Sequence, residues 1–238
     1  MKKLDDRFKV LIVIVLILLE SVGASSDHNM WTCIRYKLLH MSFVNVKIMM
    51  KTLPNILFLQ LVLMLLWGDY LEINLLKNAS MIFSRTKKCE NLLLLYFVRI
   101  GGLVLMSLVV ITGGIMLIYG LKGYSLSIDY GQLRGVLLYV GYLLFMVLIV
   151  NMLSVFCSTI YAVLITLGSE IVGFYFLCTI GEENLASPVL YLLPANVLNL
   201  AQHSVTNVSF VLALVALGIE LLIGFGIVNL YIKKKEWI

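Results

Sequence analysis

Long stretches without a charged residue alternate with short polar segments along the chain. A bilayer core about 30 Å thick is crossed by about 20 apolar helical residues. Ile100–Gly120 supplies 21 residues without charge, and Gly135–Ser169 supplies 35. The longer stretch would extend about 50 Å as one helix and overrun the bilayer. Because the polar residues Ser154, Ser158 and Thr159 interrupt it, the pattern predicts two helices joined by a tight turn there.

This pattern predicts an all-α, polytopic membrane protein whose single transmembrane domain, residues 1–238, is a six-helix bundle. The predicted spans are residues 10–24, 53–70, 100–120, 135–153, 160–180 and 210–232. Two connections are long enough to carry function: a cytoplasmic segment at residues 71–92 and an outer loop at residues 181–208.

The first predicted span has two interpretations. Val10–Leu19 is an apolar run behind four basic residues, and Val22-Gly23-Ala24 follows it. Small residues at that distance are typical of the cleavage site of a signal peptide. Asp5, Asp6 and Glu20 instead favour an uncleaved span. Both interpretations leave the other five helices in the same orientation.

The distribution of positive charge predicts the orientation. With six spans and a cytoplasmic N-terminus, 12 of the 18 lysines and arginines lie on the cytoplasmic side. If the first segment did not cross, the other helices would invert and the split would be 10 to 8. The positive-inside rule therefore favours the first layout, with both termini cytoplasmic.

Composition agrees with this assignment. Apolar residues make up 61% of the 238 residues and charged residues only 13%, and the mean hydropathy is +1.02. A soluble domain has about a quarter charged residues. The charged side chains here are too few to cover a water-facing surface, so lipid must cover the rest.

Three glutamates, Glu20, Glu170 and Glu220, lie within or beside predicted spans, where a carboxylate normally faces protein or a water-filled cavity. Glu170 and Glu220 each share one helix face with small residues, which let another helix approach closely. These companions are Ala162, Thr166 and Gly173 for Glu170, and Ala213, Ala216 and Gly224 for Glu220. The functional hypothesis places Glu170, Glu220 and Thr166 on a substrate or ion pathway. The alternative makes both glutamates hydrogen-bond anchors between helices.

The enzyme class that the sequence matches in part is an intramembrane metalloprotease. Glu182-Glu183 followed by His203-x-x-x-Asn207 echoes parts of the pattern of CAAX-processing proteases. No arginine follows the glutamates at the expected spacing and no second histidine lies nearby, whereas a zinc site needs about three protein ligands. The chain also lacks a phosphate-binding glycine loop and a G-x-S-x-G serine. We therefore expect no catalytic site, metal or nucleotide on this chain.

Between the second and third predicted spans lies an amphipathic, basic segment, Gly68–Arg99, that contains Ser84-Arg85-Thr86-Lys87-Lys88. This arrangement resembles the membrane subunits of type-2, export-type ABC transporters, especially the small permeases of bacteriocin and lantibiotic systems. The tight turn at Ser154–Thr159 and the segment Tyr191-Leu192-Leu193-Pro194 fit the same layout. Cys89-Glu90-Asn91 departs from it, because an aromatic and a further basic residue usually follow the arginine in that family.

The resemblance implies a multi-pass subunit in a bacterial plasma membrane, paired with itself or a related permease above two ABC ATPase subunits. ATP and Mg²⁺ would bind to those partners, nucleic acid would take no part, and the substrate would be hydrophobic or amphipathic. Ser84, Arg85, Thr86, Lys87 and Lys88 would couple the permease to the ATPase, since charge complementarity steers assembly.

Two alternatives stay open beside this one. The basic residues of the segment would equally bind anionic lipid headgroups and fix the topology. The whole chain would equally serve as a stand-alone membrane immunity or assembly protein that binds a peptide without ATP.

Overall fold

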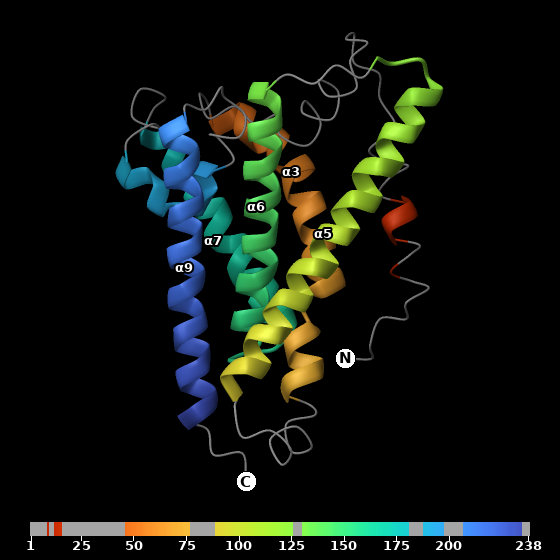
Figure 1. Ribbon diagram of the computed structural model, residues 1–238. Coiled ribbons are helices and arrows are strands. Elements are labelled where there is room, and N and C mark those ends of the chain that lie inside the picture. The colour runs from red at the N-terminus through yellow and green to blue at the C-terminus, as the bar shows by residue number, and fades with distance from the viewer. Residues whose placement is uncertain are drawn as a thin grey trace.

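The computed structural model describes residues 9, 12–15, 46–76, 89–125, 130–180, 188–197 and 207–234 of the chain. Within these residues, five long helices form a bundle (Figure 1). They are α3 (Val46–Trp67), α5 (Cys89–Leu121), α6 (Tyr130–Leu153), α7 (Thr159–Ile180) and α9 (Asn207–Lys234). The π-helix η1 (Glu72–Leu76) follows α3, and the 3-10 helix η3 (Pro188–Leu192) follows α7.

All five helices are long and apolar enough to cross a membrane. Their outer faces carry large apolar side chains such as Met106, Val109 and Leu222, which are 68%, 69% and 72% exposed. Hydrocarbon solvates such faces and water does not. The chain is therefore a multi-pass helical membrane protein, as predicted. Only residues 12–15 of the first predicted span, 10–24, are described, so the six-span count and the cytoplasmic termini stay predictions.

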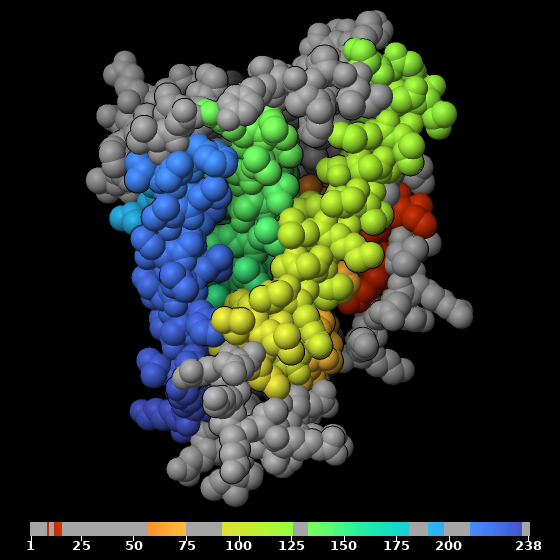
Figure 2. Space-filling view, in the orientation of Figure 1, coloured from red at the N-terminus to blue at the C-terminus, as the bar shows by residue number. Residues whose placement is uncertain are grey.

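Helix α6 is the centre of the bundle. It contacts α3, α5, α7 and α9, and 56% of its membrane-spanning stretch is buried, against 22% in α5 and in α9. Figure 1 shows α9 on one side of α6 and α5 crossing obliquely on the other. In Figure 2 the surface of α6 is visible between these two helices. The other four long helices therefore pack around α6.

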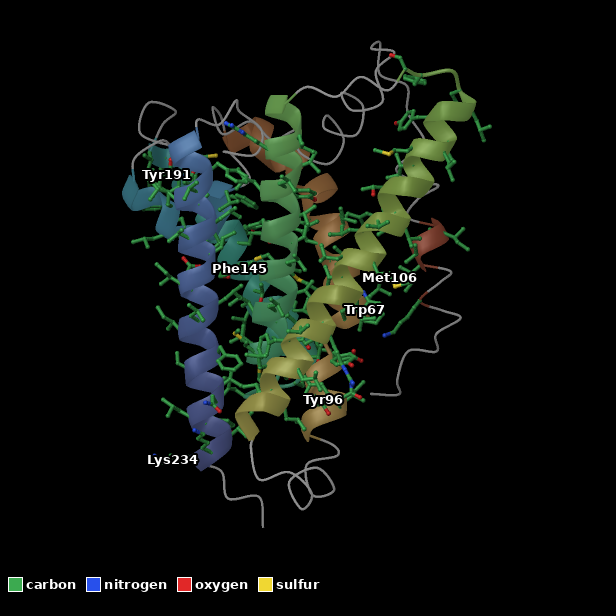
Figure 3. All side chains as sticks on the ribbon, viewed as in Figure 1. Trp67, Tyr96, Met106, Phe145, Tyr191 and Lys234 are labelled. Atoms are coloured by element: carbon green, nitrogen blue, oxygen red, sulfur yellow. The ribbon has the colours of Figure 1, made fainter. Side chains whose placement is uncertain are left out.

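Successive long helices run in alternating directions (Figure 1). Helices α3, α6 and α9 finish at one end of the bundle, where α5 and α7 begin. We call this end the Lys234 end and the opposite one the Tyr191 end, after two residues labelled in Figure 3.

The tight turn predicted within the long uncharged stretch is present between Leu153 and Thr159. The Ser154 amide donates to the Val150 carbonyl at 2.9 Å, and the Ser154 hydroxyl donates to the Asn151 carbonyl at 2.7 Å. These bonds occupy carbonyl groups that the end of a helix leaves open. The polar residues therefore end α6 and let α7 return across the bundle.

Helix α5 begins at Cys89, earlier than the span predicted from residue 100. The prediction stopped at Arg99 because a charge ends an apolar stretch, but a helix continues wherever its backbone hydrogen bonds continue. Part of the predicted cytoplasmic segment 71–92 is therefore helix: η1 at its start and α5 at its end. At its other end α5 closes with Gly123 at φ +81° and a bond from the Tyr124 amide to the Tyr119 carbonyl, a glycine cap.

The described part of the N-terminal segment packs on the bundle. Lys9 Nζ donates to the Leu66 carbonyl at 2.8 Å and lies 4.4 Å from the ring centroid of Trp67. Ile12 and Val13 pack against the apolar core. Lys9 thus contacts the last residues of α3, which finishes at the Lys234 end.

Candidate functional site

Three polar side chains meet inside the bundle where α3, α6 and α7 come together. Gln60 of α3 is 1% exposed, Tyr142 of α6 is fully buried, and Glu170 of α7 is 4% exposed. The Tyr142 hydroxyl donates a hydrogen bond of 2.5 Å to Glu170 Oε1. We call Gln60, Tyr142 and Glu170 the central polar cluster.

Two members of the central polar cluster are short of hydrogen-bond partners. Glu170 Oε2 and both amide atoms of Gln60 make no hydrogen bond within the part of the chain that the structure describes. The Gln60 amide lies near the Glu170 carboxyl group without a well-formed bond to it. Leaving such a buried atom unpaired costs about 1–3 kcal/mol, so buried polar groups are normally paired. The cluster therefore has unused capacity for a ligand.

Helical spacing places Glu170 on this interface. Ala162, Thr166 and Glu170 follow one another at intervals of four residues, which puts them on one face of α7, and all three are buried. A Cβ atom at Gly173 would lie 3.2 Å from the Ala195 Cβ. The small-residue face predicted around Glu170 therefore does meet protein, and the glycine lets the segment after η3 approach α7 closely.

A cavity of about 280 Å³ lies beside the central polar cluster. Helix α6 contributes the apolar residues Phe145, Met146 and Ile149 to its wall, and α7 contributes Glu170. Residues 193–195 form another part of the wall, after η3 at the Tyr191 end. Figure 3 labels Phe145 in the middle of the bundle. Apolar cavities with a few polar groups are typical binding sites for small molecules.

Glu220, the second glutamate singled out by the sequence, does not belong to this cavity wall. Ala213 and Ala216, which the sequence places on the same helix face as Glu220, are buried. A Cβ at Gly224 would lie 2.6 Å from Met152 Sδ, so α9 and α6 approach closely there. Glu220 itself has intermediate exposure. The structure thus separates the two glutamates: one lines a cavity, and the other lies at the edge of a helix contact.

A second polar cluster lies at the Lys234 end, and its bonds are complete. Asn151 of α6 is fully buried. Its Oδ1 accepts from the Leu71 amide at 3.0 Å, and its Nδ2 donates to the carbonyls of Trp67 and Val147 at 2.8 and 2.9 Å. These bonds use both hydrogens of the amide group and its oxygen. Asn151 therefore joins the end of α3 to α6 by hydrogen bonds.

Glu72 extends this cluster to the start of α7. Its Oε2 atom accepts from the Thr159 amide at 3.0 Å and from the Thr159 hydroxyl at 2.5 Å. The first amides of a helix have no partner within the helix, and the helix dipole favours a carboxylate there. Glu72 therefore joins η1 to the α6–α7 turn.

Several predicted positions lie outside the described residues. These are Ser84, Arg85, Thr86, Lys87 and Lys88 of the predicted coupling segment, and Glu182, Glu183 and His203 of the protease comparison. In the described ranges, no three histidine, cysteine or acidic side chains gather in a way that could hold a metal ion.

Sequence reasoning missed Gln60, Tyr142 and Asn151. The available signal was a neutral polar residue inside an otherwise apolar span, because such a side chain must find a partner away from lipid. That signal points to burial but not to the neighbouring polar group, which lies on another helix in each case.

No family model matches the chain, and neither a curated protein nor a solved structure matches it. The fold and the site nevertheless define a class. The chain is a multi-pass helical membrane protein with a polar cluster and an adjoining cavity inside its bundle.

Proposed function

We propose that the chain is the membrane-spanning permease subunit of an ATP-driven ABC exporter in a bacterial plasma membrane. It pairs with itself or a related permease, and two separate ATPase subunits bind ATP and Mg²⁺. The substrate is hydrophobic or amphipathic, such as an antimicrobial peptide. In this proposal the chain has no catalytic site of its own.

The observation that carries the proposal is the cavity beside Glu170. Glu170 is the twelfth residue of α7, about 16 Å from the start of that helix at 1.5 Å per residue. This depth is close to the middle of a bilayer, where carboxyl groups are rare and commonly mark substrate or ion pathways. A mostly apolar cavity with a few polar groups at that depth suits a hydrophobic or amphipathic substrate.

The order of the elements also supports the proposal. A tight turn joins α6 to α7, and η3 lies between α7 and α9 and contacts α9. Helix α9 ends with Lys233 and Lys234. The tight turn and the segment between α7 and α9 belong to the layout on which the resemblance to export-type permeases rests.

Purification of the tagged chain from its own cells in mild detergent tests the partnership. We expect an ATPase subunit to co-purify and the complex to hydrolyse ATP. Arg85→Glu combined with Lys87→Glu should lower the amount of co-purified ATPase at least tenfold, because reversed charge repels an acidic docking groove. Lys233→Glu combined with Lys234→Glu makes the same change in net charge at exposed positions and should leave the complex intact.

Two outcomes contradict the proposal. A chain that purifies alone, and protects cells from a peptide after every ATPase gene near its own has been deleted, is a stand-alone immunity protein. If both double variants lose the co-purified ATPase equally, the loss follows from the change in net charge of the chain and not from coupling at residues 84–88.

A further inference from the structure

The hydroxyl groups of the cavity wall have their protons committed within the protein. Thr166 Oγ1 donates to the Ala162 carbonyl at 2.8 Å, and Ser169 Oγ donates to the Thr166 carbonyl at 2.8 Å. The Tyr142 hydroxyl donates to Glu170 Oε1. Each of these oxygens keeps acceptor lone pairs, and the carboxyl group of Glu170 adds an oxygen with no partner among the described residues. The polar side chains of the wall therefore offer acceptors.

Among the residues that the structure describes, no lysine, arginine or histidine belongs to the wall of the cavity. The remaining side chains there, such as Phe145, Met146, Ile149 and Leu193, are apolar. Among the described residues of the wall, a carboxylate or phosphate would find no side-chain donor that is free to bind it. The Gln60 amide has a free donor, but Gln60 does not belong to the wall. An ammonium group, in contrast, carries three donors and no acceptor.

We propose that this cavity binds an amphipathic cation: an alkyl chain or apolar side chain that ends in an ammonium group. The ammonium group donates to Glu170 and to the hydroxyl oxygens of Thr166 and Ser169, and the apolar part packs against the α6 wall. This inference specifies the substrate class of the proposed exporter. That the bound cation is also transported rests on the proposed function, whereas its binding in the cavity does not.

The size and position of the cavity fit such a ligand. A volume of about 280 Å³ is close to the lower end of small-molecule sites, which begin at about 300 Å³. It therefore accommodates an amine with a short apolar chain, or the end of a lysine side chain on a larger peptide. Ser169 is exposed, so the cavity reaches the outer surface of α7.

Three probes of equal chain length test the charge preference: octylammonium, 1-octanol and octanoate. Each is titrated by calorimetry into the full chain in a nonionic detergent, below the concentration at which the probe forms micelles. We expect saturable binding of octylammonium, at least tenfold weaker binding of 1-octanol, and no binding of octanoate. Equal binding of octylammonium and 1-octanol, or tighter binding of octanoate, overturns the proposal.

Two glutamate variants form a matched pair. Glu170→Gln should weaken octylammonium binding at least tenfold and leave 1-octanol binding within about twofold, since a charge-assisted hydrogen bond is roughly twice as strong as a neutral one. Glu220→Gln makes the same change in α9, at a carboxyl group outside the described wall of the cavity, and should change neither. Equal losses in the two variants assign the binding to the general charge of the membrane domain and contradict the site.

A third variant tests the cavity without touching a carboxyl group. Ser169→Phe places a large side chain at an exposed part of the wall and should weaken both octylammonium and 1-octanol at least fivefold. Unchanged binding of both probes places the ligand elsewhere and overturns the proposal. These measurements use the isolated chain, so they fail or succeed independently of whether an ATPase partner exists.

Discussion

Two buried side-chain amides in this protein differ in their hydrogen bonding. Asn151, at the Lys234 end, is fully buried and makes three bonds, two to the end of α3 and its continuation and one to its own helix. Gln60, in the middle of α3, is 1% exposed and makes none among the described residues. Both amides come from apolar helices and both lie at contacts between helices.

This difference separates a polar group that fixes the fold from one that is free to bind. Asn151 has used its donors and its acceptor, so it holds α3 and α6 in one relative position. Gln60 lies near Glu170, and neither group is fully satisfied. A half-satisfied network is worse for stability than an apolar core. Its presence beside a cavity is therefore better explained by ligand binding than by stability.

The largest effect on stability is expected at the satisfied amide. Asn151→Leu keeps a similar side-chain volume but leaves the Leu71 amide and the Trp67 carbonyl unpaired. We expect the free energy of unfolding to fall by about 2–5 kcal/mol, from three bonds of about 0.6–1.7 kcal/mol each in a membrane protein. Titration with sodium dodecyl sulfate, followed by circular dichroism, measures it. A loss below about 0.5 kcal/mol would contradict the structural role given to Asn151.

A close contact next to Asn151 should give the second largest loss. A Cβ atom at Gly68 would clash with the Met64 carbonyl oxygen and would lie 2.8 Å from Val150 Cγ1. Gly68→Ala should therefore lower the free energy of unfolding by about 1–3 kcal/mol. The same titration measures it. Gly113 is the control, because nothing lies within 4 Å of the Cβ that Gly113→Ala adds. That change should raise stability by about 1 kcal/mol through helix propensity. Equal effects at both glycines would contradict close packing at the Lys234 end.

The smallest effect is expected at the unsatisfied amide, and it has the opposite sign. Gln60→Leu removes two buried polar atoms that lack partners, so the free energy of unfolding should stay unchanged or rise by about 1 kcal/mol. The measurement is the same titration as for Asn151→Leu, which makes the two amides directly comparable. A loss as large as that of Asn151→Leu would show that Gln60 is a structural group and would remove the contrast.

Local pattern was enough to predict several features. The turn after Leu153 followed from the length of the uncharged stretch and its polar residues. The buried face of Ala162, Thr166 and Glu170 followed from spacing alone. Both depend on neighbours in the sequence, within a few turns of one helix, and a helix repeats its faces predictably.

The partners of these residues were not predictable from the chain. Asn151 meets Trp67 across a sequence separation of 84 residues, and Tyr142 meets Glu170 across 28. Hydropathy assigns a residue to a span but gives neither the rotation of that span nor its neighbours. It places Glu170 and Glu220 alike inside apolar spans, with Glu220 the more prominent because it is central in the last one, whereas the structure places only Glu170 in the described cavity wall.

The sequence by itself determined that this is a helical membrane protein, because apolar stretches of the right length must form helices to satisfy their backbone in lipid. It also determined where a helix must turn back. Only the tertiary structure decided which polar groups are satisfied: Asn151 and Glu72 are paired, whereas Gln60 and Glu170 keep open positions beside a cavity. The physical reason is that a hydrogen bond between helices depends on distance and direction in space, and residues far apart in the chain acquire these only when the bundle packs.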